Sequence, residues 1–63
     1  MILRQGSEGE LVKILQTLLN LRDIDGIFGK ITAASVVGFQ KRNGLVQDGV
    51  VGPLTWSKLG YKP

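Results

Sequence analysis

The apolar residues of the first predicted helix lie three or four positions apart: Leu11, Ile14, Leu15, Leu18 and Leu19. This spacing places them on one face of a helix. Ser7 and Glu10 have the S-x-x-E spacing of a capping box, in which the two side chains satisfy free N–H groups at a helix start. Asn20 suits the end of the helix. The pattern predicts a helix over residues 8–20.

A second helix is predicted over residues 30–42, with Phe39 in its apolar stripe. Lys41 and Arg42 complement the negative end of the helix dipole, and Asn43-Gly44 supplies a left-handed residue that ends the helix.

The third predicted helix is short and covers residues 53–59. Gly52 fits its N-cap, and Pro53 fits the first helical position, where the missing N–H costs nothing. Three helices and no strand pattern indicate a compact all-α fold.

An internal repeat connects these helices. DGIFGKIT, residues 25–32, aligns without gaps on DGVVGPLT, residues 48–55, each copy preceding a helix. We expect a structural signature made up of Asp25, Gly26, Phe28, Gly29, Thr32, Phe39, Asp48, Gly49, Gly52 and Thr55. In such a loop the Asp carboxylate accepts hydrogen bonds from nearby backbone N–H groups, and the first Gly adopts a positive φ. The apolar residue that follows is expected to enter the core. The second Gly turns the chain into the helix, and the Thr bonds back toward the loop. These roles are structural.

Two loop chemistries are excluded. A calcium-binding EF-hand that opened at Asp23 would need glycine at its sixth position and glutamate at its twelfth, where Ala34 stands. A phosphate-binding loop ending at Lys30 would need Ser or Thr next, but Ile31 follows.

Composition narrows the function classes. The 63 residues include no cysteine and no histidine, which excludes disulfides, imidazole-based catalysis and nearly every zinc site. We therefore expect no catalytic residue, no metal and no cofactor. The net charge of +3 is modest and scattered, unlike the basic face of a nucleic-acid binder. Apolar runs are too short to cross a membrane, and the first residues lack the pattern of an export signal.

Three blocks of the sequence resemble the motifs of the peptidoglycan-binding modules of cell-wall hydrolases. LRQGSEG with the later Val12 and Leu15-Gln16 is similar to their opening, and DGIFGKIT followed by Phe39-Gln40 to their middle. The ending GL..DGVVGPLTW is also similar, so that the resemblance covers essentially the whole chain. Ser35 replaces the usual alanine, and the link from Gln16 to Asp25 is shorter than in many members.

The resemblance implies one three-helix module over residues 1–63 that binds peptidoglycan without catalysis. Such modules target a catalytic wall-hydrolase domain, in the same full-length chain, to its substrate, as in autolysins, endolysins and spore-cortex lytic enzymes. We expect a monomer that acts at the cell wall or periplasmic face, without nucleic-acid or membrane partners. The missing export signal would fit an excised domain or phage-type release. The alternative is a protein-interaction scaffold that kept the fold and lost wall affinity.

Peptidoglycan offers sugar rings, amides and carboxylates, which aromatic, amide and cationic side chains would bind. The ligand-binding candidates are Gln16, Arg22, Gln40, Arg42, Trp56 and Tyr61. Several have competing structural roles. Gln16 and Gln40 each follow the large apolar residue of a stripe and could instead hydrogen-bond the repeated loops. Trp56 and Tyr61 could instead pack against the core, and Arg42 is accounted for by the helix dipole.

Overall fold

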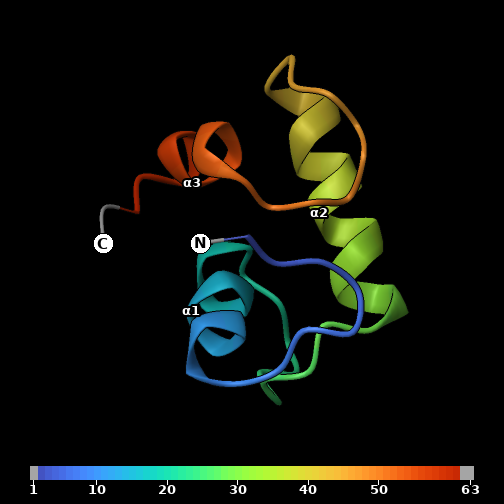
Figure 1. The fold of residues 1–63 in the computed structure, drawn as a ribbon, viewed down its shortest axis with the longest axis vertical. Helices are drawn as coiled ribbons and strands as arrows, with labels where there is room; N and C mark the ends of the chain where they lie inside the picture. The colour runs from blue at the N-terminus through green and yellow to red at the C-terminus, as the bar shows by residue number, and fades with distance from the viewer. Residues whose placement is uncertain (1, 62–63) are drawn as a thin grey trace.

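The computed structural model describes residues 2–61, which contain three helices and no strand (Figure 1). Helix α1 comprises Glu10–Leu18, α2 Lys30–Arg42 and α3 Pro53–Leu59. In Figure 1, α2 follows the long axis, and α1 and α3 lie beside its lower and upper halves. The expected all-α architecture is confirmed. Helices α2 and α3 have the bounds expected from the sequence, whereas α1 is shorter at both ends.

The predicted capping box of α1 does not form. The helix begins at Glu10 after Gly9, whose φ is 119°, and no side chain caps it. The Ser7 hydroxyl instead accepts a hydrogen bond from the Arg4 backbone N–H at 3.1 Å, and the Ser7 N–H donates to the Arg4 carbonyl. Because this local turn occupies Ser7 two residues before the N-cap, its side chain is not available to the helix.

The buried face of α1 is rotated from the predicted stripe. Val12, Leu15 and Gln16 are buried, whereas Leu18 is 36% exposed. The predicted stripe therefore had the right period and the wrong centre, because the pattern gave no weight to a glutamine as a buried residue.

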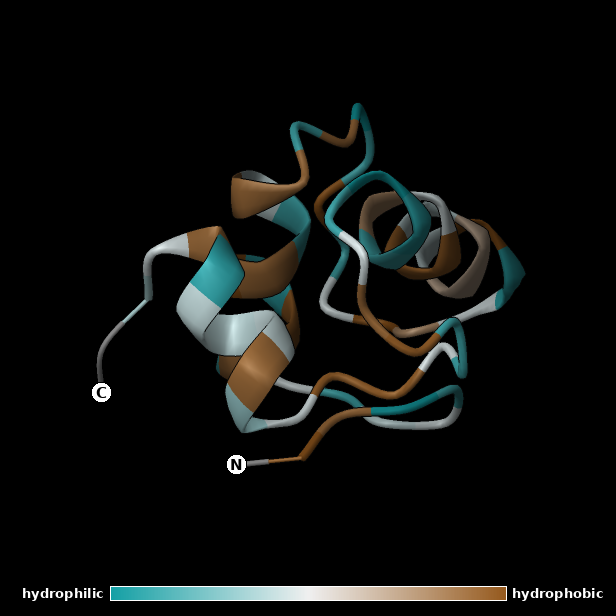
Figure 2. Cartoon of the chain, turned by 90° about the horizontal axis from the view of Figure 1, so that it is seen from above, coloured by the Kyte–Doolittle hydropathy of each residue, from teal (hydrophilic) through white to brown (hydrophobic). Residues whose placement is uncertain are grey.

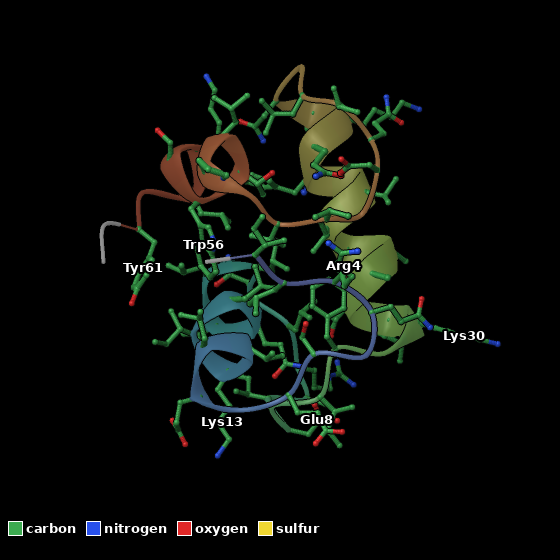
Figure 3. The ribbon with its side chains drawn as sticks, viewed as in Figure 1. Arg4, Glu8, Lys13, Lys30, Trp56 and Tyr61 are labelled. Carbon is green, nitrogen blue, oxygen red and sulfur yellow. The ribbon has the colours of Figure 1, made fainter. Side chains whose placement is uncertain are left out.

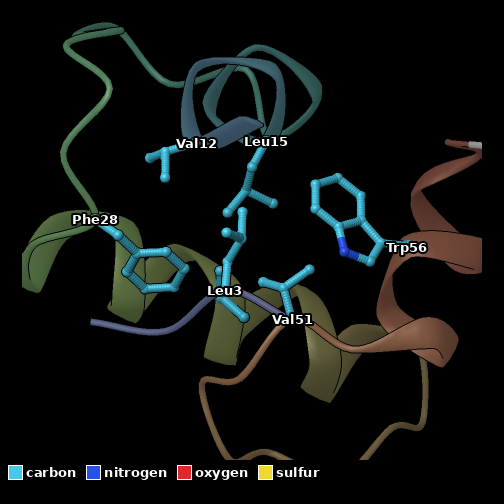
Figure 4. Packing of buried hydrophobic residues seen from close by; sticks show 7 residues of the cluster. Leu3, Val12, Leu15, Phe28, Val51 and Trp56 are labelled. Carbon is cyan, nitrogen blue, oxygen red and sulfur yellow. The ribbon is translucent and has the colours of Figure 1, made fainter. Parts of the chain in front are cut away.

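Seven buried apolar side chains form the core: Leu3, Val12, Leu15, Phe28, Val36, Val51 and Trp56 (Figure 4). Phe28 and Val51 occupy the same position in the two repeated loops, so each loop inserts one apolar side chain between the helices. Phe39 is partly exposed and lies outside this cluster. Its expected place in the core is wrong, because the buried face of α2 is formed by Thr32, Val36 and Gln40.

The N-terminal segment crosses both loops and binds them together (Figure 1). Leu3 and Val51 exchange two backbone hydrogen bonds, of 3.1 and 2.8 Å. The Gly6 N–H donates to the Phe28 carbonyl at 2.9 Å, and the Phe28 N–H donates to Ser7. The two halves of the repeat are thus held at equivalent residues by one extended strand-like segment.

All three helices end in the same way. A residue with positive φ follows each of them, namely Asn20, Gly44 and Gly60, with φ of 59°, 69° and 83°. The N–H one residue further on donates to a carbonyl five residues back, at 2.9 to 3.1 Å, from Leu21 to Gln16, Leu45 to Gln40 and Tyr61 to Trp56. This is the Schellman arrangement. It gives both repeated loops the same starting direction.

The molecule keeps several apolar side chains at its surface. Figure 2 shows hydrophobic residues in the connecting segments as well as in the helices. Ile27, Ile31, Val46 and Leu54 are 53 to 76% exposed, and the repeat places Ile31 and Leu54 at equivalent positions. Within residues 2–61, no helix has the length and apolar character needed to cross a bilayer.

Candidate functional site

The side-chain amide of Gln16 organises the first loop. Its Oε1 accepts from the Gly26 N–H at 3.0 Å, while Nε2 lies 3.0 Å from Asp25 Oδ1, 3.1 Å from the Ile27 carbonyl and 3.1 Å from Thr32 Oγ1. Gln16 is 1% exposed. An amide is required because one end must accept and the other donate. We call these contacts the Gln16 network.

Gln40 makes the same contacts in the second loop, and we call them the Gln40 network. Its Oε1 accepts from the Gly49 N–H at 3.0 Å. Its Nε2 lies 3.0 Å from Asp48 Oδ1, 2.9 Å from the Val50 carbonyl and 3.3 Å from Thr55 Oγ1. Each network joins the end of one helix, the loop and the first turn of the next helix.

Gln16 and Gln40 therefore have structural roles in this fold. Both amides are buried and fully engaged, so neither presents a polar group to a ligand. Of the two roles that the sequence left open for these residues, the geometry supports hydrogen bonding to the repeated loops.

The loop carboxylates are held in their charged form. The Gln16 side-chain hydrogen bond, with the Ile27 N–H, lowers the pKa of Asp25 below its ordinary value. The Val50 N–H, followed by the Gln40 side chain, lowers the pKa of Asp48 in the same way. Each carboxylate accepts a hydrogen bond from the backbone N–H two residues further on and so stabilises its turn, as expected from the Asp-Gly pairs.

An open pocket of about 590 Å³ lies over the first loop, and we call it pocket A. The side chains that give it its chemistry are Arg22, Asp23, Ile27, Lys30 and Ile31, and Gln16 and Thr32 form part of its floor. Figure 3 shows the Lys30 side chain extending from the start of α2 into solvent. Because Asp25 also lines it, pocket A combines two cations, two carboxylates and exposed apolar groups.

Pocket B is the equivalent depression over the second loop, with a volume of about 210 Å³. Val46 and Pro53 stand where pocket A has Arg22 and Lys30, and Leu54 replaces Ile31. The two pockets share a scaffold and differ in chemistry.

One extra residue in the first loop accompanies the difference in volume. Nine positions separate Gln16 from Asp25, and eight separate Gln40 from Asp48. Because both networks fix the loop ends in the same geometry, the additional residue must be accommodated at the surface, among Arg22, Asp23 and Ile24.

The remaining ligand candidates lie apart from pocket A. Trp56 is 3% exposed and packs between α3 and α1, so it presents no open ring face (Figure 3). Tyr61 is partly buried, and its ring centroid lies 5.0 Å from that of Trp56. Arg42 is exposed at the far end of α2, roughly 18 Å along the axis from Lys30 at 1.5 Å per residue.

Two of the sequence-predicted ligand candidates, Gln16 and Arg22, line pocket A, and of these only Arg22 has an exposed side chain. Sequence reasoning missed Asp23, Ile27, Lys30 and Ile31. A signal was present, since Ile27 and Ile31 are apolar in both repeat copies although Phe28 already supplies the buried residue. No group of three or more metal-binding side chains occurs within the described residues.

The family model for the peptidoglycan binding domain matches residues 8–59. The chain belongs to this family. Domains of the family act at the bacterial cell wall as non-catalytic binding modules of wall hydrolases, and the matched residues include both glutamine networks and both pockets. The family and the non-catalytic character expected from the sequence are confirmed.

Three related proteins place this peptidoglycan-binding domain within larger chains. The zinc D-Ala-D-Ala carboxypeptidase of Streptomyces albus G is 43% identical over 65 residues, which cover 90% of this chain and 25% of the enzyme. A peptidoglycan-binding protein from Clostridioides difficile, solved in complex with glutamine hydroxamate, is 45% identical with a TM-score of 0.90. That match covers 95% of this chain and 40% of that one. The Burkholderia AP3 phage endolysin is 42% identical with a TM-score of 0.91, over 100% of this chain and 27% of that one.

The curated relatives are longer than this domain, which spans 57% and 25% of the length of two of them. In the relatives that are enzymes, such as the carboxypeptidase and the endolysin, the domain is therefore one part of a larger protein.

Proposed function

We propose that this domain binds peptidoglycan through pocket A and its rim, and thereby holds an associated wall-hydrolase domain at its substrate. The observation that carries the proposal is the family match over residues 8–59, which includes a pocket that combines Arg22 and Lys30 with exposed apolar side chains. The related carboxypeptidase and endolysin support the link to a hydrolase in the same full-length chain. The domain acts as a monomer at the wall, without membrane or nucleic-acid partners.

Tethering explains how weak binding by one small module is sufficient. A linked catalytic domain experiences a high effective concentration of substrate while the module is bound, without any additional contact. Rapid exchange at a single pocket would also let the enzyme move along the wall.

Co-sedimentation with purified sacculi, stripped of teichoic acid, tests this function over a series of salt concentrations. We expect saturable binding that persists at moderate salt. Binding that disappears as the Debye length falls below about 8 Å would reduce the interaction to charge attraction by a +3 domain. If the folded domain does not bind at any salt concentration, the proposal fails and the scaffold alternative is favoured.

A further inference from the structure

We infer that pocket A recognises the stem peptide of peptidoglycan and that the glycan strand contributes little to binding. This inference rests on the proposed function and specifies which part of the polymer the domain reads. It follows from the side chains that the fold exposes and from those that it buries.

The fold leaves no open aromatic surface in either pocket for a sugar ring. Sugars are held largely through C–H groups that stack on the negative face of an aromatic ring. Phe28 and Trp56 are 1% and 3% exposed. Phe39 and Tyr61 are partly buried and line neither pocket A nor pocket B. A glycan strand in pocket A would therefore lack ring stacking as a source of binding energy.

The charges of pocket A complement a stem peptide. Such a peptide carries carboxylates at its acidic residue and its C-terminus, and an amine or further carboxylate on its diamino acid. Arg22 and Lys30 are exposed cations that line pocket A, and Asp23 and Asp25 are exposed carboxylates of the same pocket, so that it offers partners for both the carboxylates and the amine of such a peptide. Arg22 can bind a carboxylate in the bidentate manner that a sugar hydroxyl cannot reproduce.

The apolar part of pocket A fits the alanine residues of the same peptide. Ile27 and Ile31 are 53% and 75% exposed at the first loop and the first turn of α2. A run of methyl groups between charged ends matches two apolar side chains between Arg22, Asp23 and Lys30. The glycan strand offers no comparable arrangement of apolar and charged groups.

Pocket B provides an internal comparison. The repeat gives it the same loop geometry, but Val46 and Pro53 replace both rim cations and its volume is smaller. If loop geometry alone bound the ligand, both pockets would take it. Charge complementarity assigns the peptide to pocket A.

The test compares three ligands: intact sacculi, immobilised glycan strands from which an amidase has removed the peptides, and a soluble stem tetrapeptide. We expect binding to intact sacculi and to the peptide, and loss of binding to the stripped glycan. The double variant Arg22→Gln/Lys30→Gln should weaken peptide binding about tenfold or more, as expected for the loss of two charge-assisted contacts. The control Lys41→Gln/Lys58→Gln removes the same net charge from residues that line neither pocket, and should bind like the wild type.

Each alternative outcome has a distinct meaning. Equal binding to intact sacculi and to the peptide-free glycan, with no binding of the soluble peptide, would overturn the inference. The proposed function would still hold. Unchanged peptide binding by the folded Arg22→Gln/Lys30→Gln variant would overturn the assignment to pocket A. If the wild type does not bind intact sacculi, the proposed function fails. The titration with soluble peptide then tests the inference separately. The inference is overturned if the peptide gives no saturable response.

Discussion

The side chains of Gln16 and Thr32 meet at 3.1 Å across the first loop and connect the end of α1 to the first turn of α2. The same contact recurs between Gln40 and Thr55 at 3.3 Å. Both glutamines also supply the backbone carbonyl that ends their helix. A glutamine thus fixes where α1 and α2 end and how the next helix starts, and pocket A lies over the first of these two junctions.

Replacement of Gln16 by Leu should destabilise the domain severely. It keeps the apolar bulk but leaves the buried Gly26 N–H without its acceptor and removes the donor to the Ile27 carbonyl. Each unsatisfied buried group costs about 1–3 kcal/mol, compared with a total stability of about 3–5 kcal/mol for so small a core. Urea unfolding followed by circular dichroism measures the loss. Gln47→Leu is the exposed control, and equal midpoints for both variants would contradict the role of the network.

Two glycines should respond to alanine in opposite directions. At Gly26, with φ of 74°, an added Cβ would lie 3.2 Å from the Gly9 carbonyl oxygen and from the Lys13 side chain. Gly26→Ala should therefore cost at least the roughly 1–2 kcal/mol of a left-handed residue. At Gly38, inside α2, a Cβ would meet only the Arg42 side chain at 3.4 Å.

Gly38→Ala should accordingly stabilise the domain by about 0.5–1 kcal/mol, because alanine favours a helix interior. No other backbone approaches Gly38 closely enough to require the absence of a side chain. Thermal melts of the wild type and both variants measure the two changes in melting temperature, which should have opposite signs. A lowered melting temperature for Gly38→Ala would contradict this interpretation.

The stability of the domain should fall in acid. Because the folded pKa values of Asp25 and Asp48 are lowered from 3.8, their stabilising contribution is complete above pH 3.8 and is lost as the pH falls through the folded values. Asn at both positions retains the acceptor oxygen, so Asp25→Asn/Asp48→Asn should flatten this dependence. Unfolding curves between pH 5 and pH 2 measure it, with Asp23→Asn as a control that bonds neither glutamine. An unchanged acid slope in the double variant would exclude these carboxylates as the cause.

The loss of stability on truncating an apolar side chain to alanine should increase with the burial of that side chain. Leu15→Ala and Phe28→Ala remove fully buried side chains and should each cost about 2–5 kcal/mol. Phe39→Ala removes a partly exposed ring outside the core cluster, and should cost less than either. Denaturant midpoints give the order, and a larger loss for Phe39→Ala would contradict the assignment of the core.

The helices and the repeated loops could be predicted because their signals are local. Pro53 at a helix start, Gly44 after a helix end and the Asp-Gly pairs each act through backbone conformation within a few residues. The role of Gln16 and Gln40 could be predicted only as one of two alternatives, since a buried amide is determined by partners eight to sixteen positions away.

The capping box and pocket A depended on tertiary structure. Ser7 has the right spacing from Glu10, but the N-terminal segment turns at Arg4. The Arg4 backbone N–H there donates a hydrogen bond to the Ser7 hydroxyl. In the sequence Lys30 has the pattern of an ordinary helix residue, and only the fold places it in the lining of the same pocket as Arg22. Such proximity across a loop has no periodic signal in the sequence.

The most direct test of the account follows the backbone amide resonances of the ¹⁵N-labelled domain during titration with soluble peptidoglycan fragments that carry stem peptides. We expect saturable shifts at Arg22, Ile27 and Ile31, around pocket A. Val46 and Leu54 at pocket B should change little. Shifts concentrated at pocket B or around Tyr61, or no shifts at millimolar fragment, would contradict it.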